Sequence, residues 1–234
     1  MRFANTLKFD IQFQFRHGFY YAYLFVTVIY ALALINLAPD LRASITTLLL
    51  FTDTAMIGFF FIGGVVLLEK GQNIFEALFS TPIRLREYLL SKIVSLTFLA
   101  TLSSLAIVFA AHGLPAKLTL FILGFFCSSC VYTLFGIIFA CYARNVNDYF
   151  AKAMGFGILL SLPLVEYTGL FSLPIFYLFP SKATILLLDV IVKNSGTPQL
   201  VYAFVCLIIW TVIAWVVAKR TMHNKIIYKI GSAQ

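Results

Sequence analysis

The sequence predicts an all-α membrane protein with six transmembrane helices. Of its 234 residues, 62% are hydrophobic and only 11% are charged, whereas about 25% of the residues in an ordinary soluble domain are charged. This composition argues against a soluble enzyme, a disordered chain and a disulfide-rich scaffold. The apolar runs are long and continuous and carry no period-2 pattern, which argues against a membrane β-barrel.

The first 18 residues are expected to form a helix that lies in the membrane interface. On a helix, one side of this segment is apolar and consists of Phe3, Ala4, Leu7, Ile11 and Phe15, as in interfacial helices. Residues 9–15 also alternate with period 2, which would suit a strand. The helix is favoured because a lone strand beside a membrane has no partner for its backbone. The segment carries Asp10 and lacks a signal-peptide cleavage pattern.

The remaining elements follow from the lengths of the apolar runs. Crossing roughly 30 Å of hydrocarbon takes about 20 apolar residues. Five runs meet that length and one is shorter; the predicted spans are residues 19–38, 45–68, 88–111, 118–143, 151–166 (the short one) and 200–218. A Pro-broken apolar stretch, residues 167–192, separates the last two spans. No large soluble domain fits in the remainder, so residues 1–234 are expected to form one transmembrane domain.

The positions of the basic residues predict the orientation. If both termini are cytoplasmic, 13 of the 17 Lys and Arg residues fall in inner segments and 4 in outer loops. This bias follows the positive-inside rule and supports an even number of spans. It also explains the net charge of +8 without a nucleic-acid partner, and no basic-aromatic patch of the nucleic-acid type is present.

The sequence contains none of the common catalytic or nucleotide-binding motifs. Without a G-x-x-x-x-G-K-[ST] pattern, the chain should not bind ATP through a P-loop, and H-E-x-x-H, G-x-S-x-G and G-x-G-x-x-G are also missing. His17, His112 and His223 lie far apart at span ends, so no metal site is expected. Cys127 and Cys130 share a helix face inside an apolar run, where Cys usually serves as a small apolar filler.

Two acidic residues near or inside the spans have two interpretations each. Asp53 lies within the second predicted span, where a carboxylate costs about 2.5–3.5 kcal/mol on insertion scales. It either lines a cavity or forms a structural hydrogen bond between helices. Glu166 ends the fifth span and lies at the outer interface or lines an exit.

The inner loop between the second and third spans, residues 69–92, is the most informative segment. Asn73 is a good N-cap, with Glu76 at the third helical position. A two-turn helix over residues 73–80 is therefore expected, and its apolar side consists of Ile74, Phe75, Leu78 and Phe79. Thr81 can cap the next helix, with Pro82 at its first position. The two Phe side chains either lie on the membrane surface or fill a cleft on a soluble partner.

This loop resembles the corresponding loop of type-2 ABC transporter permeases. In that family a Glu ends the second span, a Gly-containing turn leads to a coupling helix, and a Thr-Pro pair precedes a third span that begins near a Lys. The matching positions here are Glu69, Gly71, residues 73–80, Thr81–Pro82 and Lys92.

Other features resemble the same family in the same order. The N-terminal helix, with Asp10 and Arg16, is similar to its elbow helix, and residues 144–148 are similar to its polar loop between spans four and five. Prolines at 163, 174 and 180 match a short fifth span followed by an outer re-entrant helical hairpin, here residues 167–192. The small size is loosely similar to that of fluoroquinolone-export permeases.

The resemblance implies one half of an exporter in the inner (cytoplasmic) membrane. Two such subunits, identical or not, would pair above two separate ABC ATPase subunits that hold ATP and Mg, while this chain binds no cofactor. The residues that would contact the ATPase are Glu69, Asn73, Phe75, Glu76, Phe79 and Arg84. The second and fifth spans would line a path at the dimer interface, with Asp53, Phe60, Gly63, Gly64, Gly155, Gly157, Pro163 and Glu166 as candidates. For Gly155 and Gly157, close helix packing is an equal alternative.

The Phe-rich, charge-poor spans suggest an apolar or amphipathic cargo, such as a drug, a lipid-like molecule or a hydrophobic peptide. A haem exporter is less favoured, because no His lies where it could meet haem. The alternative from another class is a secondary transporter without an ATPase partner. Such folds tend to show internal repeats with broken helices in matching positions, and no convincing three-span repeat is present. An intramembrane enzyme would need clustered polar groups deep within the membrane. A membrane assembly factor without transport activity is a further alternative that the sequence leaves open.

Overall fold

The computed structural model describes residues 2–79, 81, 83–113, 117–193 and 198–227, and the regular elements in these ranges are all helical. The all-α class predicted from composition is therefore confirmed. The α-helices are α1 (Arg2–Arg16), α2 (Phe19–Ile35), α3 (Pro39–Thr52), α4 (Gly58–Gly71), α5 (Ile74–Phe79), α6 (Leu85–His112), α7 (Leu118–Tyr142), α8 (Val146–Ser161), α9 (Pro163–Tyr167), α10 (Pro180–Val192) and α11 (Pro198–Met222). Shorter elements are π-helical turns at Asp53–Ile57 and His223–Ile227 and a 3₁₀ turn at Pro174–Leu178.

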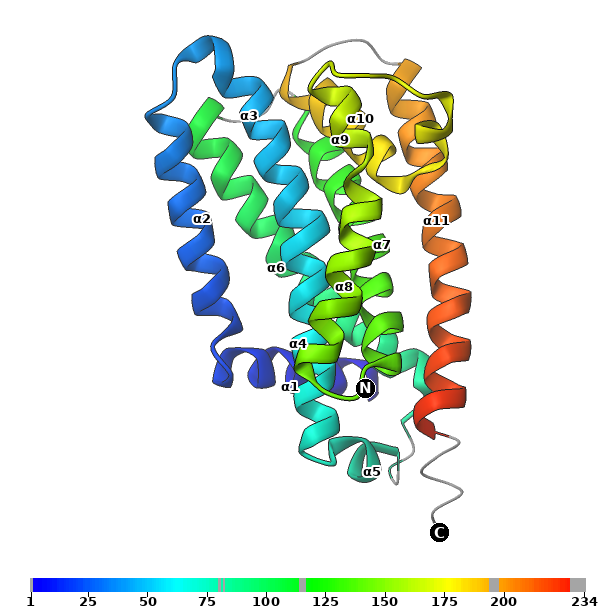
Figure 1. The fold of residues 1–234 in the computed structure, drawn as a ribbon. Coiled ribbons are helices and arrows are strands. Elements are labelled where there is room, and N and C mark those ends of the chain that lie inside the picture. The colour runs from blue at the N-terminus through cyan, green and yellow to red at the C-terminus, as the bar shows by residue number, and fades with distance from the viewer. Residues whose placement is uncertain (1, 80, 82, 114–116, 194–197, 228–234) are drawn as a thin grey trace.

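Five helical stretches are long and apolar enough to cross a membrane: Pro39–Gly71, Leu85–His112, Leu118–Tyr142, Val146–Tyr167 and Pro198–Lys225. A sixth is obtained if α1 and α2, which meet at a 66° bend, are counted together. With 17 residues, α2 alone is at the lower limit for a span. The long helices run side by side, and α1 lies across one end of the bundle (Figure 1). The chain is an integral membrane protein by these features.

The N-terminal segment is a helix rather than a strand, and it contacts the bundle through its polar side. Asp10 and Gln14 are buried together with Phe13, whereas Ile11 and Phe15, on the predicted apolar side, are exposed. Gly18, with φ of 81°, adopts a conformation that is easy only for glycine and makes the corner into α2. The apolar side is therefore free to meet lipid.

The second predicted span is longer than expected and contains a π-helical turn. The helix begins at Pro39, not at residue 45, because proline is well suited to the first helical position. The turn at Asp53–Ile57 separates α3 from α4 without ending the helix. Such π-turns often mark functional positions, and no sequence signal had indicated one here.

The fifth predicted span is also longer at its start. It begins at Val146 rather than residue 151, because the Asn145 side chain accepts a hydrogen bond of 2.8 Å from the backbone N–H of Asp148. After α9, the stretch 167–192 contains α10, which is too short to cross a membrane and packs against α3, α7 and α11. Its side chains are nearly all buried, so protein surrounds this short helix.

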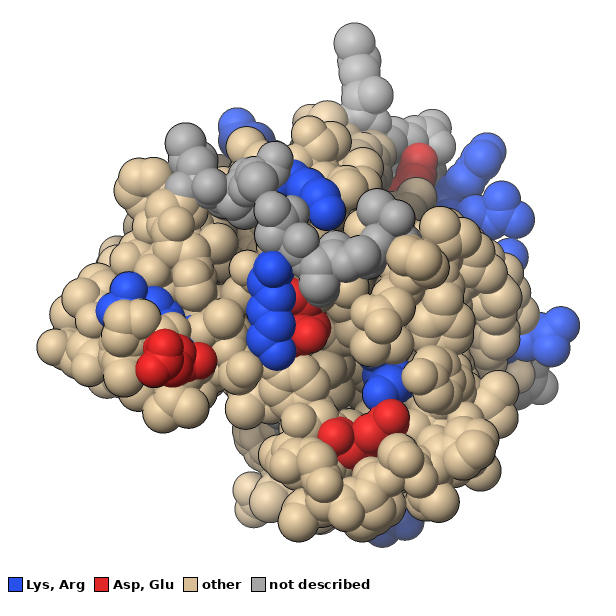
Figure 2. Space-filling model, turned by 90° about the horizontal axis from the view of Figure 1, so that it is seen from above, with Lys and Arg blue, Asp and Glu red and all other residues tan. Residues whose placement is uncertain are grey.

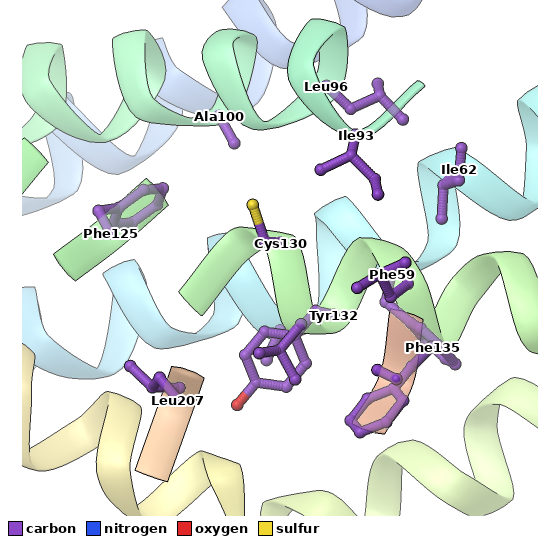
Figure 3. Close-up of a cluster of buried hydrophobic side chains, with 14 of the residues drawn as sticks. Phe59, Ile62, Ile93, Leu96, Ala100, Phe125, Cys130, Tyr132, Phe135 and Leu207 are labelled. Atoms are coloured by element: carbon purple, nitrogen blue, oxygen red, sulfur yellow. The ribbon is translucent and has the colours of Figure 1, made fainter. Parts of the chain in front are cut away.

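Helix α7 lies at the centre of the bundle and packs against α4, α6, α10 and α11. Figure 3 shows the core around it, with Phe59 and Ile62 from α4, Ile93 and Leu96 from α6, and Leu207 from α11. Cys130 of α7 lies within this cluster and is 8% exposed, as expected of an apolar filler.

The two ends of the bundle differ in the elements that they carry. The end with α1 and α5 is called the α5 end below (Figure 1). Figure 2 shows the opposite end, where the surface is mostly uncharged and acidic side chains lie beside basic ones. Lys182 of α10 pairs with Glu166 of α9, and Lys193, directly after α10, pairs with Asp189; each distance is 2.8 Å.

Candidate functional site

A buried ionic cluster joins three helices at the α5 end. Lys92, in the second turn of α6, donates hydrogen bonds to Asp10 Oδ1 of α1 at 2.5 Å and to Glu69 Oε1 near the end of α4. All three side chains are at most 2% exposed. One ammonium group therefore binds two carboxylates that come from two different helices, α1 and α4.

The remaining carboxylate oxygens of this ionic cluster also have donors. The Tyr88 hydroxyl donates to Glu69 Oε2 at 2.6 Å, and the Ser91 hydroxyl donates to Asp10 Oδ2. Lys92 Nζ also lies 5.2 Å from the centre of the Tyr88 ring, within the range of a cation–π contact. Buried charges are tolerated when they are paired and fully hydrogen-bonded, so the ionic cluster holds α1 and α4 in fixed positions on α6.

Helix α5 is attached to this ionic cluster through Phe75. The helix begins at Ile74, directly after Asn73, which has a φ of 54°, and the Glu76 N–H donates to the Asn73 carbonyl at 3.2 Å. The Phe75 side chain is 4% exposed and meets the Tyr88 ring edge-on, with 5.8 Å between the ring centres. Tyr88 thus touches both the α5 aromatic and the Glu69 carboxylate.

The start of α6 differs from the prediction. The helix begins at Leu85, because the Arg84 backbone N–H donates to the Glu87 carboxylate at 2.8 Å and Glu87 thereby caps the helix. The Thr81 hydroxyl instead donates to the Leu78 carbonyl at 2.5 Å, so the predicted cap at Thr81 is wrong. Ser80 and Pro82 lie outside the described residues.

The predicted partner-contact residues fall into two groups. Glu69 and Phe75 are buried within the chain, whereas Asn73, Glu76 and Arg84 are exposed at the α5 end. The side chain of Phe79 lies outside the described part of the structure. Direct contact of any of these residues with an ATPase stays a prediction, and in this conformation Phe75 is turned toward Tyr88 rather than away from the bundle.

Asp53 is buried inside the helix bundle. Its side chain is 0% exposed, and neither carboxylate oxygen has a hydrogen-bond partner within the described chain. The buried hydroxyls of Tyr23 and Ser129 also lack partners there, and both lie near Gly58, where an added Cβ would be 3.8 Å from the Tyr23 oxygen and 4.0 Å from the Ser129 oxygen. Asp53 therefore begins the π-helical turn in a polar but unpaired environment.

The predicted path residues on α4 mainly pack against aromatic rings. A Cβ on Gly63 would lie 2.0 Å from Cζ of Tyr149 on α8, so this glycine makes room for the ring. Gly64 faces the ring of Phe19, with an added Cβ 3.6 Å away. Phe60 is half-buried and stacks on Phe150, with ring centres 5.4 Å apart.

The predicted path residues near α8 lie in different environments. Gly155 is exposed, with no atom within 4 Å of an added Cβ, whereas Gly157 and Pro163 are buried. Glu166 pairs with Lys182 at 2.8 Å. A shared path of these residues with Asp53 at a subunit interface stays a prediction.

Sequence reasoning noted Asp10 and Lys92 but missed their contact. The two residues are 82 positions apart, and no local pattern pairs them. A charge in a mostly apolar segment was the available signal, because such a charge needs a partner.

Comparisons with known proteins agree with the membrane architecture. The sequence profile of the fluoroquinolones export permease protein family matches residues 1–230. Two fluoroquinolones export permease proteins of Mycobacterium tuberculosis, from strain CDC 1551 / Oshkosh and strain ATCC 25618 / H37Rv, are each 31% identical to this chain over 188 residues. These alignments cover 80% of this chain and 79% of each relative.

Proposed function

Because this chain belongs to the fluoroquinolones export permease protein family, we propose that it is the membrane subunit of an ATP-driven ABC exporter. A separate ATPase subunit binds ATP and Mg and docks at the α5 end. A second permease subunit, identical or not, completes the transporter. Both termini then lie on the cytoplasmic side of the inner membrane, where the excess of basic residues favours them.

The attachment of α5 is the observation that carries this proposal. The helix lies at one end of the bundle, beyond the long helices (Figure 1), and Phe75 packs on Tyr88, which hydrogen-bonds to Glu69. A displacement of α5 would therefore be transmitted to both α4 and α6. A coupling helix needs such a connection to the spans. In the same proposal, α1 serves as the elbow helix.

The exposed residues of the loop are the proposed contacts. Asn73 and Glu76 are exposed at the start of α5, and Arg84 is exposed just before α6. Phe75 is buried against Tyr88 and transmits the displacement. This assignment divides the loop into residues that touch the ATPase and residues that transfer its motion.

The cargo is proposed to be a fluoroquinolone or a similar amphipathic drug, because the relatives are described as fluoroquinolones export permeases. Two spans have largely exposed apolar surfaces. Within the most apolar 18-residue segment of each span, 28% of α8–α9 and 22% of the α11 span are buried. A second subunit could cover one of these surfaces and enclose a path beside Gly155. In this arrangement α10 corresponds to the re-entrant hairpin.

The test uses tagged chain purified from its native membranes. We expect a P-loop ATPase to copurify with the wild type and to be lost from the Glu76→Arg variant, because the reversed charge alters the exposed surface of α5. The Phe75→Ala variant should retain the ATPase but lower drug-stimulated ATP hydrolysis. Asp40→Arg is the matched control, since Asp40 is also an exposed acid but lies at the opposite end.

A secondary transporter would give a different set of results. The purified chain would then contain no P-loop protein, and drug export from vesicles would follow an ion gradient without ATP. That outcome would overturn the proposed ATPase partnership. ATP hydrolysis by the chain purified alone would also contradict it.

A further inference from the structure

A cavity lies between the start of α6 and the end of α11, at the α5 end of the bundle. Its volume is about 700 Å³. Its lining combines basic and apolar side chains and consists of Arg86, Leu90, Trp215, Val216, Lys219, Arg220, His223 and Asn224. Helix α11 is part of the stretch Pro198–Lys225, which is long and apolar enough to cross the membrane. Because the cavity lies near the end of this stretch, it lies at the level where the span leaves the hydrocarbon.

The basic side chains of this cavity have no acidic partner in the described chain. Arg86, Lys219 and Arg220 are absent from the ion pairs found there, whose cations are Lys92, Lys152, Lys182 and Lys193. Three positive charges therefore converge on one pocket without a counter-ion from the protein. Such a concentration of charge attracts an anion.

The other half of the lining is apolar. Leu90 and Val216 are each 42% exposed. Trp215 also lines the cavity and is partly buried against the hydrophobic core. Tryptophan is enriched at this level of a membrane because its ring is amphipathic. A small inorganic anion would leave this apolar half of the cavity unfilled.

We propose that this cavity binds an anionic phospholipid. Its phosphate lies among Arg86, Lys219 and Arg220, and one acyl chain lies on Leu90 and Trp215. Arginine guanidinium groups suit phosphate oxygens because they donate parallel hydrogen bonds. A zwitterionic lipid is a poorer ligand, since its own cationic group already compensates the phosphate. Basic pockets between transmembrane helices recognise acidic headgroups on the same principle.

The two tryptophans of the chain allow a direct test. The Trp210→Phe variant keeps Trp215 as the only tryptophan, in the proposed site. The Trp215→Phe variant keeps Trp210, which lines a separate cavity with Tyr177 and Leu178. Each variant is reconstituted in vesicles containing brominated phosphatidylglycerol or brominated phosphatidylcholine, and quenching of the fluorescence gives relative binding constants.

Trp215 should report a preference of at least about tenfold for phosphatidylglycerol, the scale expected from several basic side chains near a lipid headgroup. Trp210 should report nearly equal binding of the two lipids. The preference should disappear when Arg86, Lys219 and Arg220 are all changed to Gln in the Trp210→Phe background. The matched control changes Lys8, Arg16 and Arg144 to Gln, which removes the same charge from exposed positions outside the cavity, and it should keep the preference.

Three results would overturn the proposal. Equal quenching of Trp215 by the two lipids would show that the site does not select an anionic lipid, and this arm does not depend on the folding of the triple variant. Loss of the preference in the matched control would assign it to general surface charge. Displacement of the brominated lipid by millimolar inorganic phosphate would identify a free-phosphate site instead. None of these measurements depends on the ATPase partner.

Discussion

Replacing Lys92 by Met removes the only cation of the buried ionic cluster. The methionine side chain has a similar length but leaves the Asp10 and Glu69 carboxylates facing each other without a positive charge. Each carboxylate keeps one donor, the Ser91 hydroxyl for Asp10 and the Tyr88 hydroxyl for Glu69. Uncompensated charge at a site that is at most 2% exposed is the physical cause of the expected loss.

The expected loss in the free energy of unfolding is about 3–5 kcal/mol, the range for breaking a buried ion pair by removing one partner.

The assay is equilibrium unfolding in mixed micelles, followed by far-ultraviolet circular dichroism and by the reactivity of buried thiols. Cys130 and Cys141 are free and buried, so both become reactive only when the bundle opens. Lys152→Met is the matched control. Its pair with Asp148 is exposed, and its loss should change stability little.

A triple variant separates charge from packing. Combining Lys92→Met with Asp10→Asn and Glu69→Gln replaces the ions by neutral groups of similar size. This variant should recover to within about 2 kcal/mol of the wild type, because a neutral replacement of a buried ionic cluster is often nearly harmless. A loss below about 1 kcal/mol for Lys92→Met alone, or no recovery in the triple variant, would refute the reasoning.

Three further substitutions test the packing and the polar interior of the spans. Gly63→Ala should lower the free energy of unfolding by about 1–3 kcal/mol, since the added methyl would overlap the Tyr149 ring; unchanged stability would contradict the packing role. Gly155→Ala should raise the helix stability by roughly 0.5–1 kcal/mol in the isolated chain, where the position is open, and a loss of dimerisation would show that a second subunit packs there. Asp53→Asn should leave thermal stability unchanged or raised, because the carboxylate has no partner in the described chain and its charge is costly in a membrane. Transport should fall in this variant, and lower stability with normal transport would favour a structural role.

Several elements were predictable because local physics determines them. The thickness of the hydrocarbon sets the length of a span, and the predicted spans agree with the helices to within a few residues at most ends. The largest differences are at Pro39 and Val146, where a proline at the first helical position and the Asn145 cap, respectively, extend a helix beyond its apolar run. Helix α5 begins directly after Asn73, as its position before Glu76 predicted.

Other features depend on which helices become neighbours. The apolar side of α5 is the same in sequence whether it meets lipid, a partner or its own bundle, and only the packing of Phe75 on Tyr88 decides among them. The π-helical turn at Asp53–Ile57 contains no Gly or Pro, so the local sequence carries no signal for it.

By itself the sequence determined that this chain is a helical membrane protein and which segments form helices apolar enough to cross a bilayer, because apolar length and capping act within one segment. Only the tertiary structure decided that Lys92 pairs with Asp10 and Glu69, which are 82 and 23 positions away, and that Arg86 of α6 shares a cavity with Lys219 and Arg220 of α11. Such groupings arise when separate helices pack together, since the need of a buried charge for a partner does not specify from which helix that partner comes.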